Sequence, residues 1–246
     1  MQYFTLAEAA KRYEKYRPKV HGIIKSWLED AAGRSSFGRG IDIACGTGDS
    51  TMPLLALCDQ VIGVDASQEM INFAEKKGLT TRLCSYEDID LPDKYDLITT
   101  CMAFHWFDPL TAVEKYKSLS ADGALWLVYN FVFMGSMADQ KFNSWLVETY
   151  LADYPAPPRG KYAGAVPTDD PEIRVLKEGK GFVELSFTRE QLIGYLTTQS
   201  NIEAAVKSGR EYSDIESGLE KSMPGYDAEQ RFSYAFTYDV YEYKKS

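Results

Sequence analysis

The sequence predicts an α/β protein whose mostly parallel sheet is covered by helices on both faces. Between residues 40 and 129, short apolar runs alternate with amphipathic segments that begin at capping residues, a rhythm typical of βαβ units. The first apolar run leads into a glycine turn at Gly46 and Gly48, where the backbone can bend sharply and approach a ligand. The 246 residues suffice for one such domain with additions.

The charge balance argues against one class of partner. The chain has 27 basic and 36 acidic residues and a net charge of −9. Its lysines and arginines form no extended basic patch, so a phosphate backbone would be repelled. We therefore expect no nucleic-acid partner.

The cysteines and the apolar segments predict where the protein works. The four cysteines are widely spaced without a C-x-x-C pair, and there are only two histidines. We therefore expect no metal site, and free thiols in a reducing compartment. The amino terminus lacks an apolar core behind a basic start, and no apolar run reaches membrane-spanning length. These features predict a cytoplasmic protein without a membrane partner.

Helices and strands are expected to alternate as far as residue 129. Thr5 and Glu8 have the spacing of a capping box. Ser67 and Asp108 are expected to cap later helices, with Pro109 in the first turn of the second. The expected helices are 6–16, 21–32, 52–58, 68–77 and 109–119, and the expected strands are 40–43, 60–64, 81–85, 95–101 and 124–129.

The pattern changes after residue 129. An amphipathic helix is expected at 139–154, then a loop rich in proline and glycine at 155–171, with a new helix starting at Asp170 and Pro171. Residues 182–187 and 232–244 are expected to be strands. Three helices between these strands are predicted from capping-box spacings at Thr188 with Gln191, Ser200 with Glu203, and Ser213 with Glu216.

The glycine turn has two interpretations. A nicotinamide-binding unit needs G-x-G-x-x-G, in which the third glycine lets the helix pack on the strand. Here Thr51 follows the second glycine, and Asp42 lies inside the preceding strand. The run from Asp42 to Gly48 instead resembles motif I of the class I S-adenosylmethionine-dependent methyltransferases, usually acid-x-G-x-G-x-G. The sequence departs at Ala44, whose Cβ predicts that this position lacks a strongly positive φ.

Two further motifs resemble that family in the same order. Asp65, at the end of the second expected strand, matches the acidic residue that accepts hydrogen bonds from both ribose hydroxyls. The run from Ser85 to Pro92 resembles the loop that borders the adenine. The resemblance implies that Tyr86 offers a backbone N–H, and that Ser85 or Glu87 offers a side-chain acceptor.

The segment Tyr95 to Pro109 resembles the fourth-strand motif of the group related to trans-aconitate methyltransferase and of the type 11 group, many of which carry a His-Trp pair there. In this group Cys101 and Met102 would pass their backbone along the methionine part of the cofactor. Further upstream, Y-E-K-Y-R-P resembles a stretch that precedes the core in the same relatives. It implies that Arg17 pairs with the cofactor carboxylate and that Tyr13 covers it; a solvated arginine is the alternative.

The resemblance implies S-adenosyl-L-methionine as the cofactor and a set of residues around it. These residues are Tyr13, Arg17, Asp42, Ala44, Cys45, Gly46, Gly48, Asp65, Ala66, Met70, Ser85, Tyr86, Glu87, Cys101 and Met102.

The same resemblance implies the overall plan. We expect a doubly wound, Rossmann-like sheet of seven mostly parallel strands, with an antiparallel last strand and a helical lid. One domain is expected, with helices over the cofactor at 1–36, the cofactor-binding core at 37–130, a mostly helical substrate lid with one core strand at 131–225, and the last strand within 226–246.

The expected reaction is in-line transfer of a methyl group to a small molecule, at a carboxylate or hydroxyl oxygen. His105 is the candidate general base because its ordinary pKa suits proton transfer. A structural histidine beside Trp106 is the alternative, and a carboxylate acceptor would need no base. Trp106 and Tyr195 are candidates for lining the substrate site.

Other interpretations stay open at this point. Arg159, Arg174 and Arg189 could pair with an acidic substrate or serve as surface residues. The whole protein could instead bind S-adenosylmethionine or S-adenosylhomocysteine without catalysis, or be a nicotinamide-dependent oxidoreductase. The sequence identifies neither the acceptor nor the oligomeric state.

Overall fold

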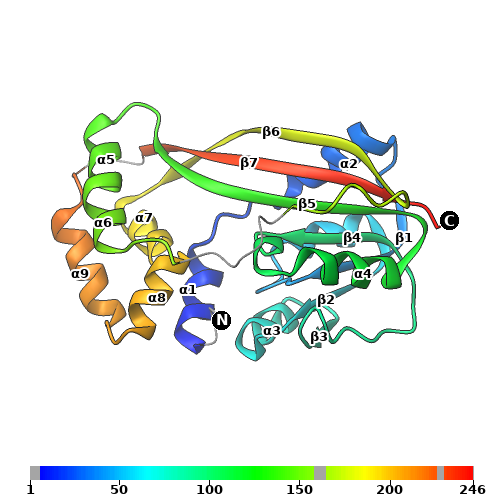
Figure 1. Ribbon diagram of the computed structural model, residues 1–246. Coiled ribbons are helices and arrows are strands. Elements are labelled where there is room, and N and C mark those ends of the chain that lie inside the picture. The colour runs from blue at the N-terminus through cyan, green and yellow to red at the C-terminus, as the bar shows by residue number, and fades with distance from the viewer. Residues whose placement is uncertain (1–5, 158–164, 226–229, 246) are drawn as a thin grey trace. The chain divides into compact units, whose positions relative to one another are not determined.

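The computed structural model describes residues 6–157, 165–225 and 230–245. These residues contain one seven-stranded sheet with the strand order β3-β2-β1-β4-β5-β7-β6 (Figure 1). The strands are β1 (Phe37–Ile43), β2 (Cys58–Asp65), β3 (Thr81–Leu83), β4 (Tyr95–Cys101), β5 (Ser120–Ser136), β6 (Ile173–Phe187) and β7 (Gln230–Tyr243).

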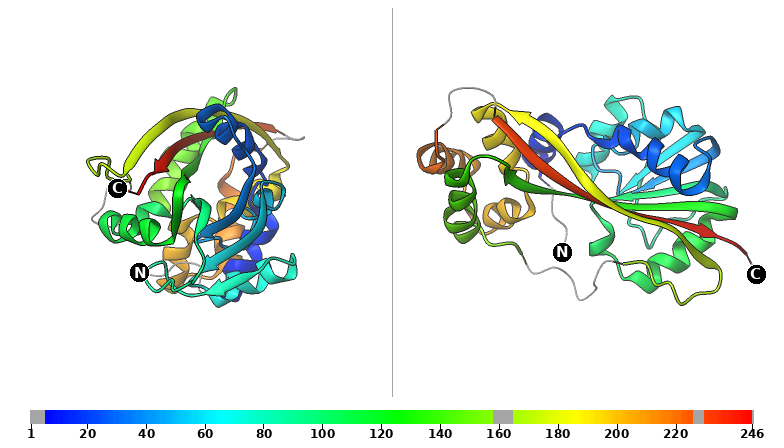
Figure 2. Two further views of the ribbon diagram at one scale, coloured as in Figure 1. Left: turned by 90° about the vertical axis from the view of Figure 1, so that its right-hand side faces the viewer. Right: turned by 90° about the horizontal axis from the view of Figure 1, so that it is seen from above.

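The sheet is doubly wound. β1 pairs in parallel with both β2 and β4, β2 pairs with β3, and β4 pairs with β5. After β1 the chain continues to β2 and β3 on one side of β1, and it then returns to the other side of β1 at β4. The topological switch point therefore lies between β1 and β4. β7 runs opposite to β5 and β6 (Figure 2). The expected fold class, including the antiparallel last strand, is confirmed.

Helices and single helical turns connect the strands. They are α1 (Ala7–Tyr16), η1 (His21–Ile23), α2 (Ile24–Ala32), η2 (Met52–Ala56), α3 (Gln68–Lys76), η3 (Phe104–Trp106), α4 (Pro109–Leu119), α5 (Gln140–Trp145), the π-turn η4 (Leu146–Tyr150), α6 (Leu151–Asp153), α7 (Arg189–Leu196), α8 (Ser200–Lys207) and α9 (Tyr212–Ser222). None of the helices in the described ranges is long and apolar enough to cross a bilayer.

The chain divides into two compact units. The sheet unit comprises Lys19–Asn130, Arg159–Lys180 and Thr237–Ser246, and the helical unit comprises Met1–Pro18, Phe131–Pro158 and Gly181–Phe236. Three strands, β5, β6 and β7, run from one unit into the other. Helix α1 belongs to the helical unit, whereas α2 belongs to the sheet unit.

Apolar strand residues and one face of α4 form the core of the sheet unit. Ile41, Ile98 and Trp126 are fully buried together with Tyr116 of α4. The Trp126 indole donates a hydrogen bond to Ser120 Oγ at 2.8 Å, so its one polar group is satisfied inside the core. α4 lies on one side of these strands, and α2 and α3 lie on the other (Figure 2).

The prediction of a helix that begins at Asp170 and Pro171 is wrong. These two residues directly precede the strand β6. Along β6, exposure alternates over much of its length, the period of a strand. The two glycines of β6 pack against aromatic rings of β7. A Cβ at Gly179 would lie 2.2 Å from the Tyr238 ring, and one at Gly181 would lie 2.6 Å from the Phe236 ring. Pairing with a distant strand therefore decides the conformation here.

Three of the expected caps are confirmed. The side chains of Ser67, Asp108 and Thr188 accept hydrogen bonds from the first turns of α3, α4 and α7, and Thr188 forms a complete capping box with Gln191. The residue pair Thr5 and Glu8 cannot be scored, because Thr5 lies outside the described residues.

The other two capping boxes are wrong. Helix α8 begins after Gln199 and α9 begins after Glu211, and neither has a side-chain cap. The acidic residues counted for these boxes have tertiary partners instead: Glu203 accepts from the Tyr212 hydroxyl, and Glu216 pairs with Arg12 of α1.

Candidate functional site

The residues between β1 and η2 form the predicted glycine turn at the switch point. Gly46 has a φ of 56° and Gly48 a φ of 87°, both in the left-handed region. A Cβ at Gly46 would meet no atom within 4 Å, whereas one at Gly48 would lie 2.3 Å from Leu79 Cδ1. Gly46 therefore leaves open space beside the backbone, and Gly48 allows α3 and the segment that follows it to pack against the turn.

Strained backbone marks the ends of both strands at the switch point. Among the described residues, Ala44 (φ 61°) and Met102 (φ 56°) are the non-glycine residues with positive φ. The expectation for Ala44 was therefore wrong. The neighbouring Cys45 N–H donates to Val64 O at 2.9 Å, and this pairing with β2 helps to hold the turn. Non-glycine residues in this region of φ concentrate at ligand sites.

Asp42 stabilises the turn through hydrogen bonds. Its side chain is fully buried, and Oδ2 accepts hydrogen bonds from Ser50 Oγ at 2.6 Å and Thr51 Oγ1 at 2.7 Å. Thr99 Oγ1 of β4 donates to Oδ1 at 2.7 Å. Burial raises the pKa of Asp42, and the three hydroxyl donors oppose that rise. Asp42 thus ties β1, the turn and β4 together.

Asp65 ends β2 beside the turn. Its Oδ2 accepts the Gly46 N–H at 2.9 Å, and its Oδ1 accepts the Ser67 N–H at 2.8 Å. The side chain is half-buried, and burial raises its pKa although these hydrogen bonds oppose the rise. Because each carboxylate oxygen has a second lone pair, both can still accept a ligand hydroxyl.

The two residues predicted beside Asp65 differ in position. Ala66 is exposed at the start of α3. The Met70 side chain is buried within the same helix at 4 % exposure, so it contributes to the core.

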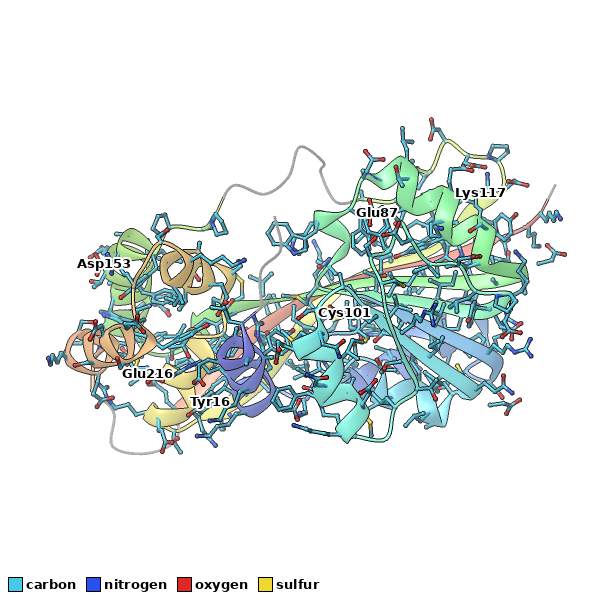
Figure 3. The ribbon with its side chains drawn as sticks, turned by 90° about the horizontal axis from the view of Figure 1, so that it is seen from below. Tyr16, Glu87, Cys101, Lys117, Asp153 and Glu216 are labelled. Atoms are coloured by element: carbon cyan, nitrogen blue, oxygen red, sulfur yellow. The ribbon has the colours of Figure 1, made fainter. Side chains whose placement is uncertain are left out.

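The loop after β3 is connected to the segment after β4. The Tyr86 ring stacks on Phe107 with centroids 4.0 Å apart, and its hydroxyl accepts the Asp108 N–H at 3.0 Å. Ser85 Oγ donates to Asp88 Oδ2 at 2.8 Å. Glu87 is exposed (Figure 3). The structure thus positions Tyr86 and Ser85 on defined partners.

At the end of β4 lies His21, which is not among the site residues predicted from the sequence. Cys101 is 8 % exposed, and its Sγ lies 3.8 Å from Nδ1 of His21. The same Nδ1 lies 3.2 Å from the Tyr129 hydroxyl of β5. His105, the candidate base, lies on η3 with its ring 4.7 Å from that of Trp106, which is 36 % exposed. One available signal was that His21 is one of two histidines and follows the R-P stretch.

Two lysines stabilise the turn by pairing with Asp49. Lys19 Nζ and Lys77 Nζ each lie 2.6 Å from Asp49 Oδ1, and Lys77 also donates to Thr47 O at 2.9 Å. Asp49 is 8 % exposed, so these ion pairs keep its buried charge compensated.

In the helical unit, Arg17 lies among aromatic rings. Its guanidinium is 4.7 Å from the centroid of Tyr13 and 5.5 Å from that of Tyr195, and Nη2 donates to Thr198 O at 2.8 Å. Arg17 Nε is buried without a hydrogen-bond partner in the described ranges. Tyr195 itself is 1 % exposed, so it forms part of the core of this unit.

The other candidate arginines have structural partners or lie outside the described residues. Arg189 binds Glu220 and the carbonyl groups of Met223 and Pro224, and Arg174 binds Glu242. Arg159 lies outside the described residues. No group of three or more metal-ligating side chains occurs in the part of the chain that the structure describes.

The segment that contains the glycine turn is similar to known methyltransferases. Residues 41–123 match the family model described as a methyltransferase domain. A provisionally named methyltransferase of Dictyostelium discoideum is 29 % identical over 211 residues, covering 81 % of this chain and 78 % of that protein. The malonyl-[acyl-carrier protein] O-methyltransferase of Priestia megaterium is 36 % identical over 93 residues, which cover 35 % of this chain and only 34 % of that enzyme.

A solved structure extends the likeness to the fold. A protein of Anaeromyxobacter dehalogenans, provisionally described as a type II methyltransferase, aligns with a TM-score of 0.66 at 19 % identity, covering 93 % of this chain and 98 % of that one. The fit of the cofactor rests on the site itself: an open glycine turn, strained strand ends and a half-buried carboxylate at the end of β2. Residues 41–123 and the fold therefore resemble those of the class I methyltransferases, which use S-adenosyl-L-methionine.

Proposed function

We propose that this methyltransferase acts on an oxygen atom of a small molecule, either a carboxylate or a hydroxyl group. The observation that supports oxygen as the acceptor is the similarity to the Priestia O-methyltransferase, which covers 35 % of this chain. The net charge of −9 favours a small molecule over nucleic acid. We also propose membership of the type 11 group and a cytoplasmic location, the latter because all four cysteines are free thiols.

The site residues suggest how the cofactor is held. Asp65 would accept the ribose hydroxyls, and the backbone at Ala44 and Gly46 would pass under the amino acid end. Asp42 acts through the turn that it supports. Cys101 and Met102 would border the methionine part. The cofactor supplies an electrophilic methyl group, and these residues position it and exclude water.

Two further residues complete the proposed cofactor site of the sheet unit. Tyr86 and Ser85 would border the adenine, because their partners already hold the loop in place. Arg17 and Tyr13 belong to the helical unit, and their binding to the cofactor carboxylate stays a prediction from the sequence.

Calorimetry with S-adenosylhomocysteine tests the cofactor site. We expect the parent protein to bind, and Asp65→Ala to bind roughly 10- to 100-fold more weakly, because charge-assisted hydrogen bonds are lost. Asp59→Ala is a matched control, because it removes an exposed carboxylate from the opposite end of the same strand, β2. Equal affinity of Asp65→Ala and the parent would contradict the proposed role of Asp65.

Product formation tests the reaction. Carboxylic acids, phenols, alcohols and amines are supplied with S-adenosylmethionine, and S-adenosylhomocysteine formation is measured. We expect turnover with oxygen acceptors. Binding of the cofactor without turnover across all four classes would favour the non-catalytic alternative. NAD and NADP should leave the melting temperature unchanged, since the family uses neither.

A further inference from the structure

His21 lies where the carboxyl end of β4 meets the middle of β5. Its Nδ1 lies 3.2 Å from the hydroxyl of Tyr129 on β5 and 3.8 Å from Sγ of Cys101 on β4. Cys101 and Tyr129 are register partners in the parallel pair β4–β5. The imidazole therefore lies at the end of β4 and beside the middle of β5, which continues to Ser136, although η1 precedes β4 by more than seventy residues.

The imidazole is held by a rigid partner. Tyr129 is fully buried, and its backbone carbonyl accepts the N–H of Met102 at 2.9 Å. Its ring contacts His21 edge-on at 5.9 Å and Trp27 at 5.7 Å, and Trp27 in turn stacks on Tyr238 at 4.3 Å. A hydroxyl fixed in this way orients the imidazole ring through Nδ1, the nitrogen that it contacts.

This position coincides with the place where the reacting group should lie. In open parallel sheets, ligands bind outside the carboxyl ends of the strands at the switch point, here between β1 and β4. The strained Met102, directly after Cys101, belongs to the same strand end. His21, on η1, therefore lies at the end of β4. The methionine part of the cofactor is proposed to lie at the same strand end.

We propose that His21 accepts the proton of a hydroxyl acceptor during methyl transfer, and that Tyr129 is its positioning residue. The inference rests on the proposed function. As the acceptor oxygen forms a bond to the methyl carbon, the carbon–sulfur bond breaks and its electron pair stays on sulfur. The acceptor O–H bond breaks, and its proton passes to Nε2 of neutral His21 and then to water.

The surroundings of His21 define the pH dependence. The titratable groups in its described contacts are the Tyr129 hydroxyl and the Cys101 thiol. Lys19, two residues earlier, is paired with Asp49. A histidine side chain accepts a proton as the neutral imidazole and repels cations once it is protonated.

Binding of two cofactor analogues tests the placement without an acceptor. Sinefungin carries an amine where S-adenosylmethionine carries the transferable methyl, and S-adenosylhomocysteine has neither group. We expect the ratio of their Kd values, sinefungin over S-adenosylhomocysteine, to rise about tenfold in the parent between pH 7.5 and pH 5.5, because a histidinium repels the ammonium. A flat ratio in the parent overturns the proposal.

Variants assign the effect. His21→Asn should abolish the pH dependence of this ratio, with unchanged affinity for S-adenosylhomocysteine at pH 7.5 as the control for folding. Tyr129→Phe keeps the ring and removes the hydroxyl, so the midpoint should move while the affinity at pH 7.5 stays the same. Loss of the dependence in His105→Asn but not in His21→Asn would assign the proton acceptor to His105 and overturn the proposal.

Turnover completes the test. With a phenol acceptor, we expect kcat of His21→Asn to fall by roughly 10²- to 10⁴-fold, and its pH profile to lose the limb on the acidic side. With a carboxylate acceptor, which carries no proton at neutral pH, kcat should change little. An equal loss with both acceptors would overturn the role in proton transfer. Failure of the proposed function would appear differently, as no turnover by the parent.

Discussion

At the scale of single residues, Asp65 has two opposing consequences for the protein. Its carboxylate holds the turn through Gly46 and the start of α3 through Ser67. Burial nevertheless raises its pKa above the ordinary value. The folded protein therefore binds a proton at Asp65 more tightly than the unfolded chain does, and this group favours folding increasingly as the pH falls through its raised pKa.

The same shift predicts the pH dependence of cofactor binding. Protonation removes acceptor capacity for the ribose hydroxyls, so the affinity for S-adenosylhomocysteine should fall with decreasing pH, beginning above the ordinary aspartate pKa of 3.8. Calorimetry between pH 7 and pH 4 measures this. Asp65→Asn, which cannot titrate, should bind more weakly with a flatter profile. A profile as steep as that of the parent would show that another group controls binding.

Two glycines of the turn should respond differently to alanine. Gly48→Ala adds a Cβ at 2.3 Å from Leu79 at a φ of 87°, so the free energy of unfolding should fall by roughly 2–4 kcal/mol from overpacking and backbone strain. Gly46→Ala meets no atom within 4 Å and should cost only about 1 kcal/mol. It should instead weaken S-adenosylhomocysteine binding, because the new methyl occupies the open side of the turn.

Denaturant unfolding and calorimetry on both glycine variants separate these effects. The reverse ranking, with Gly46→Ala the less stable variant, would contradict the packing role assigned to Gly48.

At the scale of elements, local capping signals were reliable where no tertiary partner competed. Ser67, Asp108 and Thr188 are side-chain caps, as expected. In α8 and α9, Glu203 and Glu216 bind Tyr212 and Arg12 instead. A capping box is worth about 1 kcal/mol, so packing and buried ion pairs readily override it.

The difference between a real and an apparent cap is measurable. Thr188→Ala should lower the free energy of unfolding by about 1 kcal/mol, because the Gln191 N–H loses its acceptor. Ser200→Ala removes a hydroxyl that caps no helix and should change stability by less than about 0.5 kcal/mol. Urea unfolding of the two variants tests this, and equal losses would contradict the assignment of α8.

At the scale of the whole molecule, the two units share strands. β5, β6 and β7 each continue from the sheet unit into the helical unit, and Phe131 of β5 stacks on Tyr234 of β7 with centroids 5.4 Å apart. Strands that continue through both units couple the stabilities of the units, because unfolding of one unit frees the ends of strands that are ordered in the other.

We therefore expect one cooperative unfolding transition. In differential scanning calorimetry the van't Hoff and calorimetric enthalpies should agree, and circular dichroism and tryptophan fluorescence should give the same midpoint. The sheet unit contains Trp27 and Trp126, and the helical unit contains Trp145, so fluorescence reports on both. Two resolved transitions would show that the shared strands do not couple the units.

The sequence by itself determined the fold class, the order of the sheet-unit elements and the cofactor. Glycine turns, caps and short apolar strands are local signals, and the spacing of Asp42, Gly46 and Asp65 is read directly along the chain. The second part of β6, residues 182–187, was predicted as a strand. Residues 173–181 were missed, because Tyr238 and Phe236, which pack on the glycines of β6, lie more than fifty residues away.

Only the tertiary structure decided which side chains share a site. The positive φ of Ala44 arises in a turn held by pairing with β2, which its residue type opposes. His21 meets both Cys101 and Tyr129 because the register of the parallel pair β4–β5 places these two residues side by side at the carboxyl end of β4. Such proximity depends on strand register and topology, and separations of about eighty to a hundred residues leave no local signal of it.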